Sequence, residues 1–407
     1  MTSQAGTSEL DKFRELVLSE DALQEDLGTI EDVAAFAARA SLLAGQRGIA
    51  ISADDLKTHL RDDPIGLSRR SPMPLRAEPP QDNWLPIHIA IFAQQITIDW
   101  AYFGAQRFAD PFFEESIRIA LRHPLNRLVK CRTLAADLPR WVERHADVAP
   151  SGFIFHMSRC GSTLVSQMLA SDPRNVVISE ASPIDKAAQI DRMHAALDVQ
   201  PSLLRGIVAA LGRANPARRY FIKLDSWHTL ALPLFRRAFP SVPWVFLYRD
   251  PIEVMTSQML QPGMQAIPDF VQPAWFGLEP DEGLFSERYC ARVIGRICEA
   301  VLQPYDDGSG LLVNYDQLPE ALWTAILPHF GVPCGDTERK VMAERARQDS
   351  KAPDTDFSRD SGNRRRKIQE AVKPIAEEYL RDVYDRLESL NRAASRIEAG
   401  TGKSKSA

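Results

Sequence analysis

Apolar and polar residues alternate along the second half of the chain in a pattern that predicts strands and helices in turn. Short apolar runs lie at residues 153–155, 175–180, 219–225, 244–247 and 311–315, and polar or amphipathic stretches separate them. Strands that alternate with helices are typical of a parallel sheet with helices on both faces. The pattern therefore predicts an α/β core of three layers, in which a parallel sheet is flanked by helices.

The first 63 residues follow a different pattern. Each of three segments opens with a pair of capping residues three positions apart and continues with apolar residues at helical spacing. The pairs are Ser8 and Asp11, Thr29 and Asp32, and Ser52 and Asp55. The same region holds 13 Asp and Glu residues against 6 Lys and Arg residues. We expect a small acidic helical bundle over residues 1–63.

Composition divides the rest of the chain. Five prolines between residues 64 and 83 indicate a linker. Residues 84–148 are rich in aromatic side chains, and we expect a helical layer there, so that an all-helical region precedes the α/β core. We expect the α/β domain to span residues 149–395 and a disordered tail to follow over residues 396–407.

Residues 152–164, Gly-Phe-Ile-Phe-His-Met-Ser-Arg-Cys-Gly-Ser-Thr-Leu, hold the most informative motif. A strand ends in a loop of small residues, and a helix follows at once. Backbone N–H groups of such a loop and of the first helical turn bind phosphate. Gly161 allows close approach, Ser162 and Thr163 add hydroxyl donors, and Arg159 adds a permanent charge. We predict a P-loop-like phosphate site, without the Lys that ends a Walker A motif.

A second motif lies at residues 243–259, Pro-Trp-Val-Phe-Leu-Tyr-Arg-Asp-Pro-Ile-Glu-Val-Met-Thr-Ser-Gln-Met. A buried strand delivers Arg249 at its carboxyl end, and a helix begins with Asp250 as its N-cap. Ser257 follows Arg249 by eight positions, on that helix.

Together these motifs resemble those of the sulfotransferases that use 3′-phosphoadenosine-5′-phosphosulfate (PAPS), and the resemblance covers residues 150–335. In that family, a loop of pattern Arg-x-Gly-Ser/Thr-Thr holds the 5′-phosphosulfate, and an Arg and a Ser at this spacing hold the 3′-phosphate. The resemblance implies that PAPS binds the loop residues Arg159, Cys160, Gly161, Ser162 and Thr163 and, at its other end, Arg249 and Ser257.

Candidates for the chemistry follow the next two strands. Glu180 suits the base that takes the proton of the acceptor, and Lys223 and Arg159 suit the cations that stabilise developing charge. This arrangement looks closest to the tyrosylprotein sulfotransferase branch. Asp225 stands where the cytosolic branch has its catalytic His, and we expect it to be the ion partner of Lys223. His228 is the alternative base.

Two structural roles stay open for these residues. Glu180 could cap a helix near Pro183, and His228 could be a structural residue in the first turn of a helix over residues 227–239. Basic residues near the C-terminus, Lys351 and Arg364 to Lys367, could also close the 3′-phosphate site, as a basic segment does in the family.

The resemblance implies transfer of a sulfuryl group from PAPS to a hydroxyl of a peptide or small metabolite, in line and without metal. The products are a sulfated acceptor and adenosine 3′,5′-bisphosphate. Two alternatives stay open: a P-loop-type kinase, and a non-catalytic nucleotide-binding module that recruits a partner. Residues 1–63 weakly resemble the leader-peptide domain of nitrogen-fixation-type natural-product precursors, which implies a protein or peptide partner for that bundle.

Composition narrows the setting. Five cysteines are scattered without paired spacing, which indicates neither a disulfide framework nor a zinc site and favours a cytoplasmic protein. The net charge of −5 argues against a nucleic-acid partner. No apolar run approaches the length of a membrane span.

Overall fold

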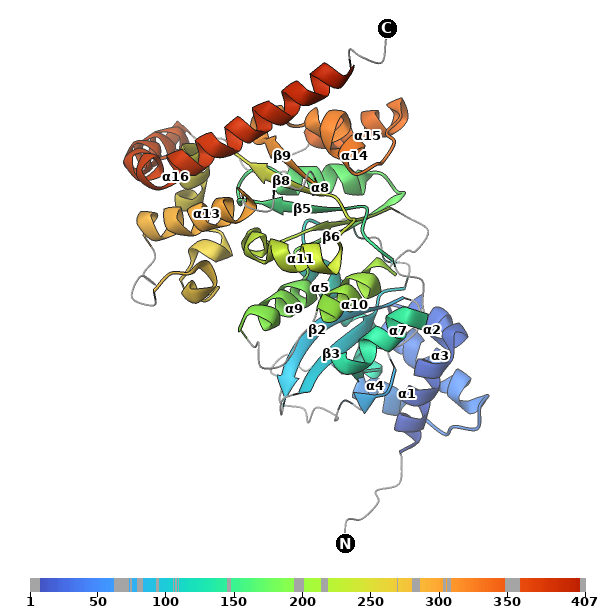
Figure 1. The fold of residues 1–407 in the computed structure, drawn as a ribbon. Coiled ribbons are helices and arrows are strands. Elements are labelled where there is room, and N and C mark those ends of the chain that lie inside the picture. Colours follow the sequence, from blue (N-terminus) through green and yellow to red (C-terminus); the bar gives the residue numbers. More distant parts are fainter. Residues whose placement is uncertain are drawn as a thin grey trace.

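The computed structural model of the chain describes residues 8–61, 73, 75–78, 83–92, 95–104, 106, 108, 110–144, 148–193, 201–213, 219–268, 270–279, 286–302, 305, 309–347 and 359–402. Figure 1 shows the N-terminal helices at one end of the molecule and the C-terminal helix at the other. In these residues, no helix combines the length and apolar character needed to cross a membrane.

A five-stranded parallel sheet forms the centre of the second half of the chain. Its strands are β5 (Gly152–His156), β6 (Asn175–Ser179), β7 (Arg219–Lys223), β8 (Trp244–Tyr248) and β9 (Gly310–Asn314). Their order is β6-β7-β5-β8-β9, and each neighbouring pair is parallel. The strands are largely buried because helices cover both faces. The predicted parallel sheet is confirmed.

Helices connect and cover these strands on both faces (Figure 1). α8 lies on one face with α15, and α9 to α13 lie on the other, as right-handed crossovers require. The helices are α8 (Ser162–Ser171), α9 (Ser182–Met193), α10 (Pro201–Gly212), α11 (Leu232–Ala238), α12 (Pro251–Leu260), α13 (Glu287–Leu302), α14 (Leu327–His329) and α15 (Asp336–Arg347). The 3-10 helices are η3 (Ser226–Ala231), η4 (Met264–Ala266), η5 (Pro273–Phe276) and η8 (Tyr315–Gln317), and η9 (Leu322–Ile326) is a π-helix.

A second sheet lies where we expected a helical layer, so that prediction is wrong for much of residues 84–148. Its strands are β1 (Leu75–Arg76), β2 (Trp84–Phe92), β3 (Gln95–Tyr102) and β4 (Cys131–Leu134), in the order β1-β4-β3-β2. Isoleucines in β2 and β3 recur at every second position, which is the period of a strand. The aromatic content of the region conceals this alternation. Helices accompany the sheet: α5 (Phe113–Arg122), α6 (Pro124–Leu128) and α7 (Leu138–Arg144), with the turn η1 (Ala135–Asp137).

Four helices form the N-terminal region: α1 (Glu9–Ser19), α2 (Asp21–Gly28), α3 (Val33–Gly45) and α4 (Ala53–His59). The predicted helical character is confirmed. Ser8 and Ser52 cap α1 and α4, each accepting a backbone N–H three residues on. The expected start at Thr29 is wrong, because Asp32 caps α3 and Thr29 instead follows the end of α2. Most of the predicted linker over residues 64–83 lies outside the described residues, and Leu75–Arg76 form β1.

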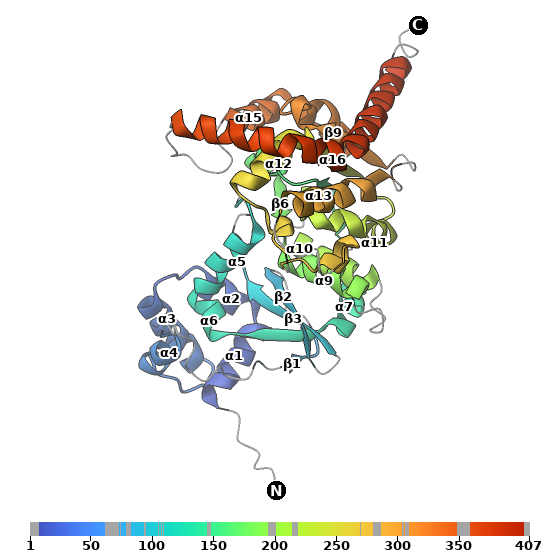
Figure 2. The same cartoon turned by 90° about the vertical axis from the view of Figure 1, so that its left-hand side faces the viewer.

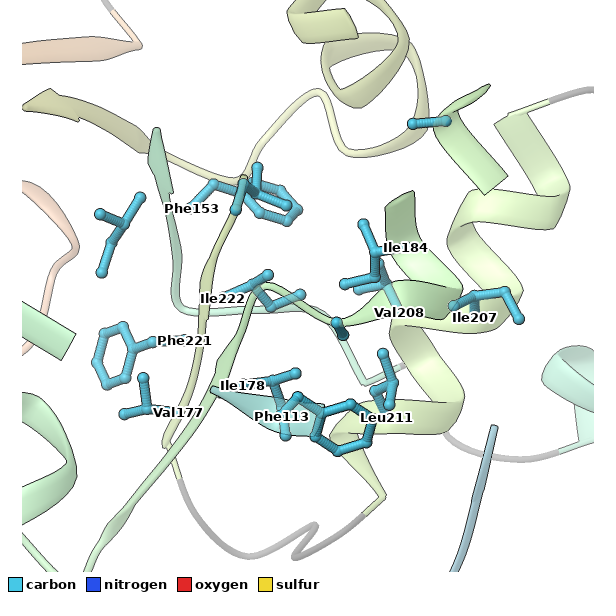
Figure 3. Close-up of a cluster of buried hydrophobic side chains, with 14 of the residues drawn as sticks. Phe113, Phe153, Val177, Ile178, Ile184, Ile207, Val208, Leu211, Phe221 and Ile222 are labelled. Atoms are coloured by element: carbon cyan, nitrogen blue, oxygen red, sulfur yellow. The ribbon is translucent and has the colours of Figure 1, made fainter. Parts of the chain in front are cut away.

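The second sheet and α7 pack against the main domain. β2 contacts α9 and α10, and α7 contacts α10. Gly206 of α10 makes the α7 contact possible, because a Cβ there would lie 2.4 Å from a Leu138 methyl group. Phe113, at the start of α5, is buried in the cluster of Figure 3 with residues of β6, β7, α9 and α10, such as Ile178 and Leu211. The N-terminal end of α5 is therefore part of the main core.

The C-terminal helix α16 (Arg359–Gly402) packs on α12 and α13 through an apolar stripe that includes Val372, Ala376, Leu380 and Leu387. It continues to Gly402, so the expected disordered tail is wrong for residues 396–402. Residues 403–407 lie outside the described part of the chain.

Candidate active site

The carboxyl ends of the five parallel strands meet at one edge of the main sheet, where ligands bind in open α/β folds. β5 ends in the loop of residues 157–161, which we call the phosphate loop. Glu180 directly follows β6, and Lys223 is the last residue of β7. Arg249 directly follows β8, and Tyr315 directly follows β9. The predicted site residues therefore gather at this edge, although they are far apart in the sequence.

The phosphate loop contains three residues in the left-handed region of backbone space. Their φ angles are 75° at Ser158, 53° at Arg159 and 86° at Gly161. Such conformations are costly for residues with side chains and concentrate at functional sites. Gly161 is also the N-cap of α8, and a Cβ there would lie 2.8 Å from the Tyr315 ring. This position requires glycine for its φ angle and for space.

Buried polar side chains hold the loop in place. The Ser158 backbone N–H donates to His156 Nδ1 at 3.0 Å, and Gln258 Nε2 donates to Ser158 Oγ at 3.1 Å. Gln258 Oε1 in turn accepts the Gly263 N–H at 2.7 Å. The Arg159 guanidinium donates to the backbone oxygen and the side-chain amide oxygen of Gln261. The loop is thus tied to α12 and to the segment that follows it.

Cys160 turns its side chain into the core. Its thiol is fully buried and lies 3.0 Å from the Leu247 backbone oxygen, to which it donates. Burial raises the pKa of Cys160 to about 12. The thiol is therefore neither a nucleophile nor a ligand for an anion, and only the backbone of Cys160 can bind an anion.

Lys223 and Glu180 form the central charge pair. Lys223 is fully buried, and its Nζ lies 2.7 Å from Glu180 Oε1. Among the described residues Glu180 is its only ion-pair partner, so other donors of the ammonium remain for a ligand. On another side it lies 4.8 Å from the centre of the Phe112 ring. A buried ammonium with unused donors is suited to hold an anionic ligand.

Glu180 lies between two buried side chains. His156 Nε2 is 3.6 Å from Glu180 Oε1, which is longer than a hydrogen bond. Burial acts to raise the pKa of Glu180, but Lys223 and His156 outweigh it and lower this pKa to about 2. The side chain is thus an ionised partner of Lys223, whereas the alternative of a helix cap would direct it toward α9.

Asp225 and His228 have structural contacts. His228 is fully buried, its Nδ1 accepts the Asp225 N–H at 3.2 Å, and its Nε2 lies 2.9 Å from Asp185 Oδ1. Burial raises the pKa of Asp225 well above its ordinary value, and the charges of Glu180 and Asp185 raise it further. The expectation that Asp225 is the ion partner of Lys223 is wrong, because among the described residues Lys223 forms its ion pair with Glu180, the residue after the neighbouring strand.

Ligand atoms of Asp185, Asp225 and His228 lie within 4.8 Å of one another, as in a metal site. Both nitrogens of the His228 ring already contact protein groups, and Trp227 Nε1 also donates to Asp185 Oδ1 at 2.6 Å. A metal ion would have to displace these contacts. The three residues fit a network that holds η3 against α9.

Arg249 forms a second cationic site at the same edge. Its guanidinium carbon lies 4.2 Å from the centre of the Tyr315 ring, and its NH2 lies 3.2 Å from Glu253 Oε2. Glu253 also accepts from Arg365 and Gln369 of α16. Two arginines from different elements thus share one carboxylate.

The hydroxyl residues of the site carry no competing contacts. Ser162 and Thr163 lie in the first turn of α8, and the hydroxyl of each, like that of Ser257 on α12, has no hydrogen-bond partner within the described part of the chain. Of the basic C-terminal residues, Arg365 reaches this edge, and Lys351 lies outside the described residues.

Sequence reasoning missed three contributors. Tyr315 packs under Arg249 and against Gly161, Glu253 links Arg249 to α16, and Phe112 reaches Lys223 from the first half of the chain. The position of Tyr315 directly after the last strand was a usable signal. Nothing local marks Phe112, because its role depends on how α5 packs on the main domain.

The variant Glu180→Gln should lower the stability of the protein. It leaves the fully buried Lys223 ammonium without its anion, so we expect the free energy of unfolding to fall by about 3 kcal/mol. Adding Lys223→Met should recover much of that loss. Urea denaturation at neutral pH measures both, and an unchanged midpoint for Glu180→Gln would show that the pair does not stabilise this edge.

The same pair predicts a pH dependence. The pKa of Glu180 is about 2 in the folded protein, against an ordinary value of 4.5. Because the folded pKa is the lower one, the stability from the pair is complete above the ordinary value and is lost as the pH falls through about 2. Carboxyl chemical shifts followed by NMR from neutral to acidic pH should show Glu180 ionised at pH 4, and a midpoint near the ordinary value would contradict this.

Comparisons with known proteins bear on this site. Residues 150–336 match the model of the sulfotransferase family. No curated protein matches the chain. The chain overlaps with a sulfotransferase from Mycobacterium avium at 15% identity and a TM-score of 0.37, over 60% of this chain and 81% of that one. With a sulfotransferase from Mycobacterium tuberculosis, the identity is 16% and the TM-score is 0.36, over 65% of this chain and 85% of that one.

With the sulfotransferase domain of a Synechococcus olefin synthase, the identity is 16% and the TM-score is 0.35, over 60% of this chain and 96% of that one. At these identities and TM-scores the overlaps carry no weight for the function. Residues 150–336, the part of the chain that contains the phosphate loop, Glu180, Lys223 and Arg249, match the model of the sulfotransferase family.

Proposed function

We propose that the protein transfers a sulfuryl group from PAPS to the hydroxyl of an acceptor without a metal ion. The observation that carries this proposal is the fully buried Lys223 ammonium, which lies at the carboxyl edge of the sheet and, among the described residues, pairs with Glu180 alone. An anionic group of the donor would accept the remaining N–H groups of this ammonium. The match of residues 150–336 to the model of the sulfotransferase family supports the same reaction.

The donor set fits a ligand that is anionic at both ends. Backbone N–H groups of the phosphate loop, the hydroxyls of Ser162 and Thr163, and Arg159 would hold the 5′-phosphosulfate. Arg249 and Ser257 would hold the 3′-phosphate. The lack of a side chain at Gly161 lets the Tyr315 ring pack against the loop.

Arg365 is a further candidate for the 3′-phosphate. It contacts the same carboxylate as Arg249, so an anion placed between the two guanidinium groups would replace Glu253 as their partner. Arg366 is the next residue on α16, is exposed, and forms no ion pair with a described residue, which makes it a matched control.

In the proposed reaction, Glu180 accepts the proton of the acceptor hydroxyl as its oxygen attacks sulfur. The bond from sulfur to the bridging oxygen breaks, and Lys223 and Arg159 stabilise the charge that develops on the leaving phosphate and on the sulfuryl oxygens. Lys223 pairs with Glu180 before the donor is present. When Lys223 turns to an anionic donor, Glu180 loses part of the contact that lowers its pKa, and it becomes a better base.

We place this reaction in the cytoplasm, since all five cysteines are free thiols, as expected in a reducing compartment. The acceptor in this proposal is a small molecule or a peptide. A segment with exposed apolar side chains, Met264, Ile267 and Phe270, follows Gln261, the partner of Arg159, and supports an acceptor with an apolar part.

The direct test is incubation of the purified protein with PAPS labelled in its sulfuryl group, together with pools of metabolites and peptides. We expect label in a new product and stoichiometric adenosine 3′,5′-bisphosphate, with EDTA present throughout. Label that stays in PAPS with every pool, while the bisphosphate still binds, would favour the non-catalytic module. Transfer from ATP that needs Mg²⁺ would favour a kinase.

Arg249→Ala should weaken adenosine 3′,5′-bisphosphate far more than adenosine 5′-phosphate, because it removes a contact to the 3′-phosphate alone. A charge-assisted contact of about 1.5–3 kcal/mol corresponds to a loss of roughly ten- to hundred-fold. Arg365→Ala should act in the same direction and Arg366→Ala should have no effect. Calorimetric titrations with the two nucleotides measure this, and equal weakening of both would place Arg249 elsewhere.

Arg159→Ala should lower turnover more than it weakens donor binding, because charge on the sulfuryl oxygens is greatest in the transition state. The measurement is kcat and the KM for PAPS with one identified acceptor. A variant with normal kcat and only a raised KM would make Arg159 a residue for donor binding alone.

Glu180→Gln should reduce turnover by about 10²–10⁴-fold while the bisphosphate still binds. Because this variant is also expected to be less stable, rates should be normalised to the folded fraction. Asp225→Asn should cost less, as Asp225 contacts His228 and is not the ion partner of Lys223. If His228→Ala abolishes turnover in a folded protein while Glu180→Gln stays active, His228 is the base.

A further inference from the structure

A pocket of about 850 Å³ lies outside the candidate active site, among α2, the end of β3 and the C-terminal half of α5. We call it the α2–α5 pocket. Figure 2 shows α5 between the N-terminal helices and the main sheet. The volume lies in the range of sites for small ligands and short peptide segments. No residue of the proposed sulfuryl transfer lines it.

The wall of this pocket is partly apolar. Tyr102, Phe103 and Ile119 line it, and Ile119 exposes 54% of its surface although it lies on a packed helix. Gly28 lets α2 approach the end of β3, because a Cβ there would lie 2.6 Å from the Tyr102 ring. The close contact fixes the shape of one side of the pocket and leaves Ile119 open to a ligand.

The charged side chains that line the pocket are Glu25, Glu31 and Arg122, so acidic groups are in excess. Glu25 and Glu31 line it, and neither has an ion-pair partner in the part of the chain that the structure describes. His123 accepts the Leu125 N–H at Nδ1, so the neutral ring carries its hydrogen on Nε2. That nitrogen is buried and, within the described residues, has no acceptor. A buried donor without a partner is a group that a ligand carbonyl can satisfy.

We propose that the α2–α5 pocket binds a peptide segment that carries a lysine or arginine side chain. The basic side chain would pair with Glu25 and Glu31, its neighbours would pack on Tyr102 and Ile119, and a backbone carbonyl would accept from His123. The acidic composition of residues 1–63, 13 acidic against 6 basic residues, would attract such a segment over a longer range.

The position of the pocket links it to transfer, a step that rests on the proposed function. α5 runs from Phe113 to Arg122, and at about 1.5 Å per residue this distance is roughly 14 Å. The N-terminal end of α5 follows Phe112, whose ring lies 4.8 Å from Lys223, and its C-terminal end lines the pocket. A peptide acceptor anchored there would extend along α5 to bring a hydroxyl to Glu180.

The test uses two fluorescein-labelled pools of hexapeptides. One has lysine fixed at a central position with aliphatic and aromatic residues on either side, and the other has Nε-acetyllysine in that place. Fluorescence anisotropy with the full-length protein should show binding of the lysine pool at least about tenfold tighter than that of the acetylated pool.

Variants locate the binding. Glu25→Gln, Glu31→Gln and Ile119→Lys should each weaken the lysine pool by about tenfold. Asp54→Asn makes the same charge change in the N-terminal helices outside the pocket, and Leu121→Lys makes the same substitution on α5 outside the lining, so both should bind as the wild type does. Equal binding of the two pools, no binding of either, or pocket variants that match their controls would overturn the proposal.

Peptide binding is measured without donor, so it fails or succeeds independently of the proposed function. Ile119→Lys should leave binding of adenosine 3′,5′-bisphosphate unchanged. If the peptides bind and the bisphosphate does not, the pocket assignment stands and the transfer function fails. If the bisphosphate binds and the peptides do not, the pocket assignment fails and the transfer function stands.

Discussion

The pairing of Lys223 with Glu180 constrains the whole carboxyl edge of the main sheet. A fully buried ammonium is unfavourable unless an anion lies beside it. The parallel pairing of β6 and β7 places Ser179 opposite Lys223, and the Glu180 N–H donates to the Lys223 backbone oxygen at 2.8 Å. The strand register therefore fixes which carboxylate meets this lysine. A shift by one residue would direct Lys223 to the other face of the sheet.

The strand order transmits this constraint to the phosphate loop. β7 lies between β6 and β5, so its terminal lysine is next to the loop that leaves β5. On the other side of β5, β8 brings Arg249 to the same edge, where Tyr315 packs on both Arg249 and the loop glycine. Lys223 is fully buried, whereas Arg249 forms an ion pair with Glu253.

Local signals in the sequence were sufficient for part of this picture. The apolar runs predicted the parallel sheet, and Asp250 caps α12 as its motif indicated, accepting from the Ile252 and Glu253 N–H groups. The second sheet was not predicted, because the aromatic residues of β2 and β3 concealed a period of two. Asp225 is not the partner of Lys223 although the two are close in sequence, because the pairing depends on which strands are neighbours.

Long-range packing explains the rest of what the sequence could not reveal. Phe112 meets Lys223 only because Phe113 is anchored in the main core, and Arg365 meets Glu253 only because α16 packs on α12. Each contact joins segments that no local pattern connects. The N-terminal half thereby contributes Phe112 to the candidate site.

The most direct measurement of the central claim is calorimetric titration of the wild-type protein with adenosine 3′,5′-bisphosphate and, separately, with ATP and Mg²⁺. A site built from the phosphate loop, Lys223 and Arg249 should bind one bisphosphate per chain in the presence of EDTA. It should bind the bisphosphate much more tightly than it binds ATP. Binding of ATP that needs Mg²⁺ and is tighter than that of the bisphosphate would contradict the account.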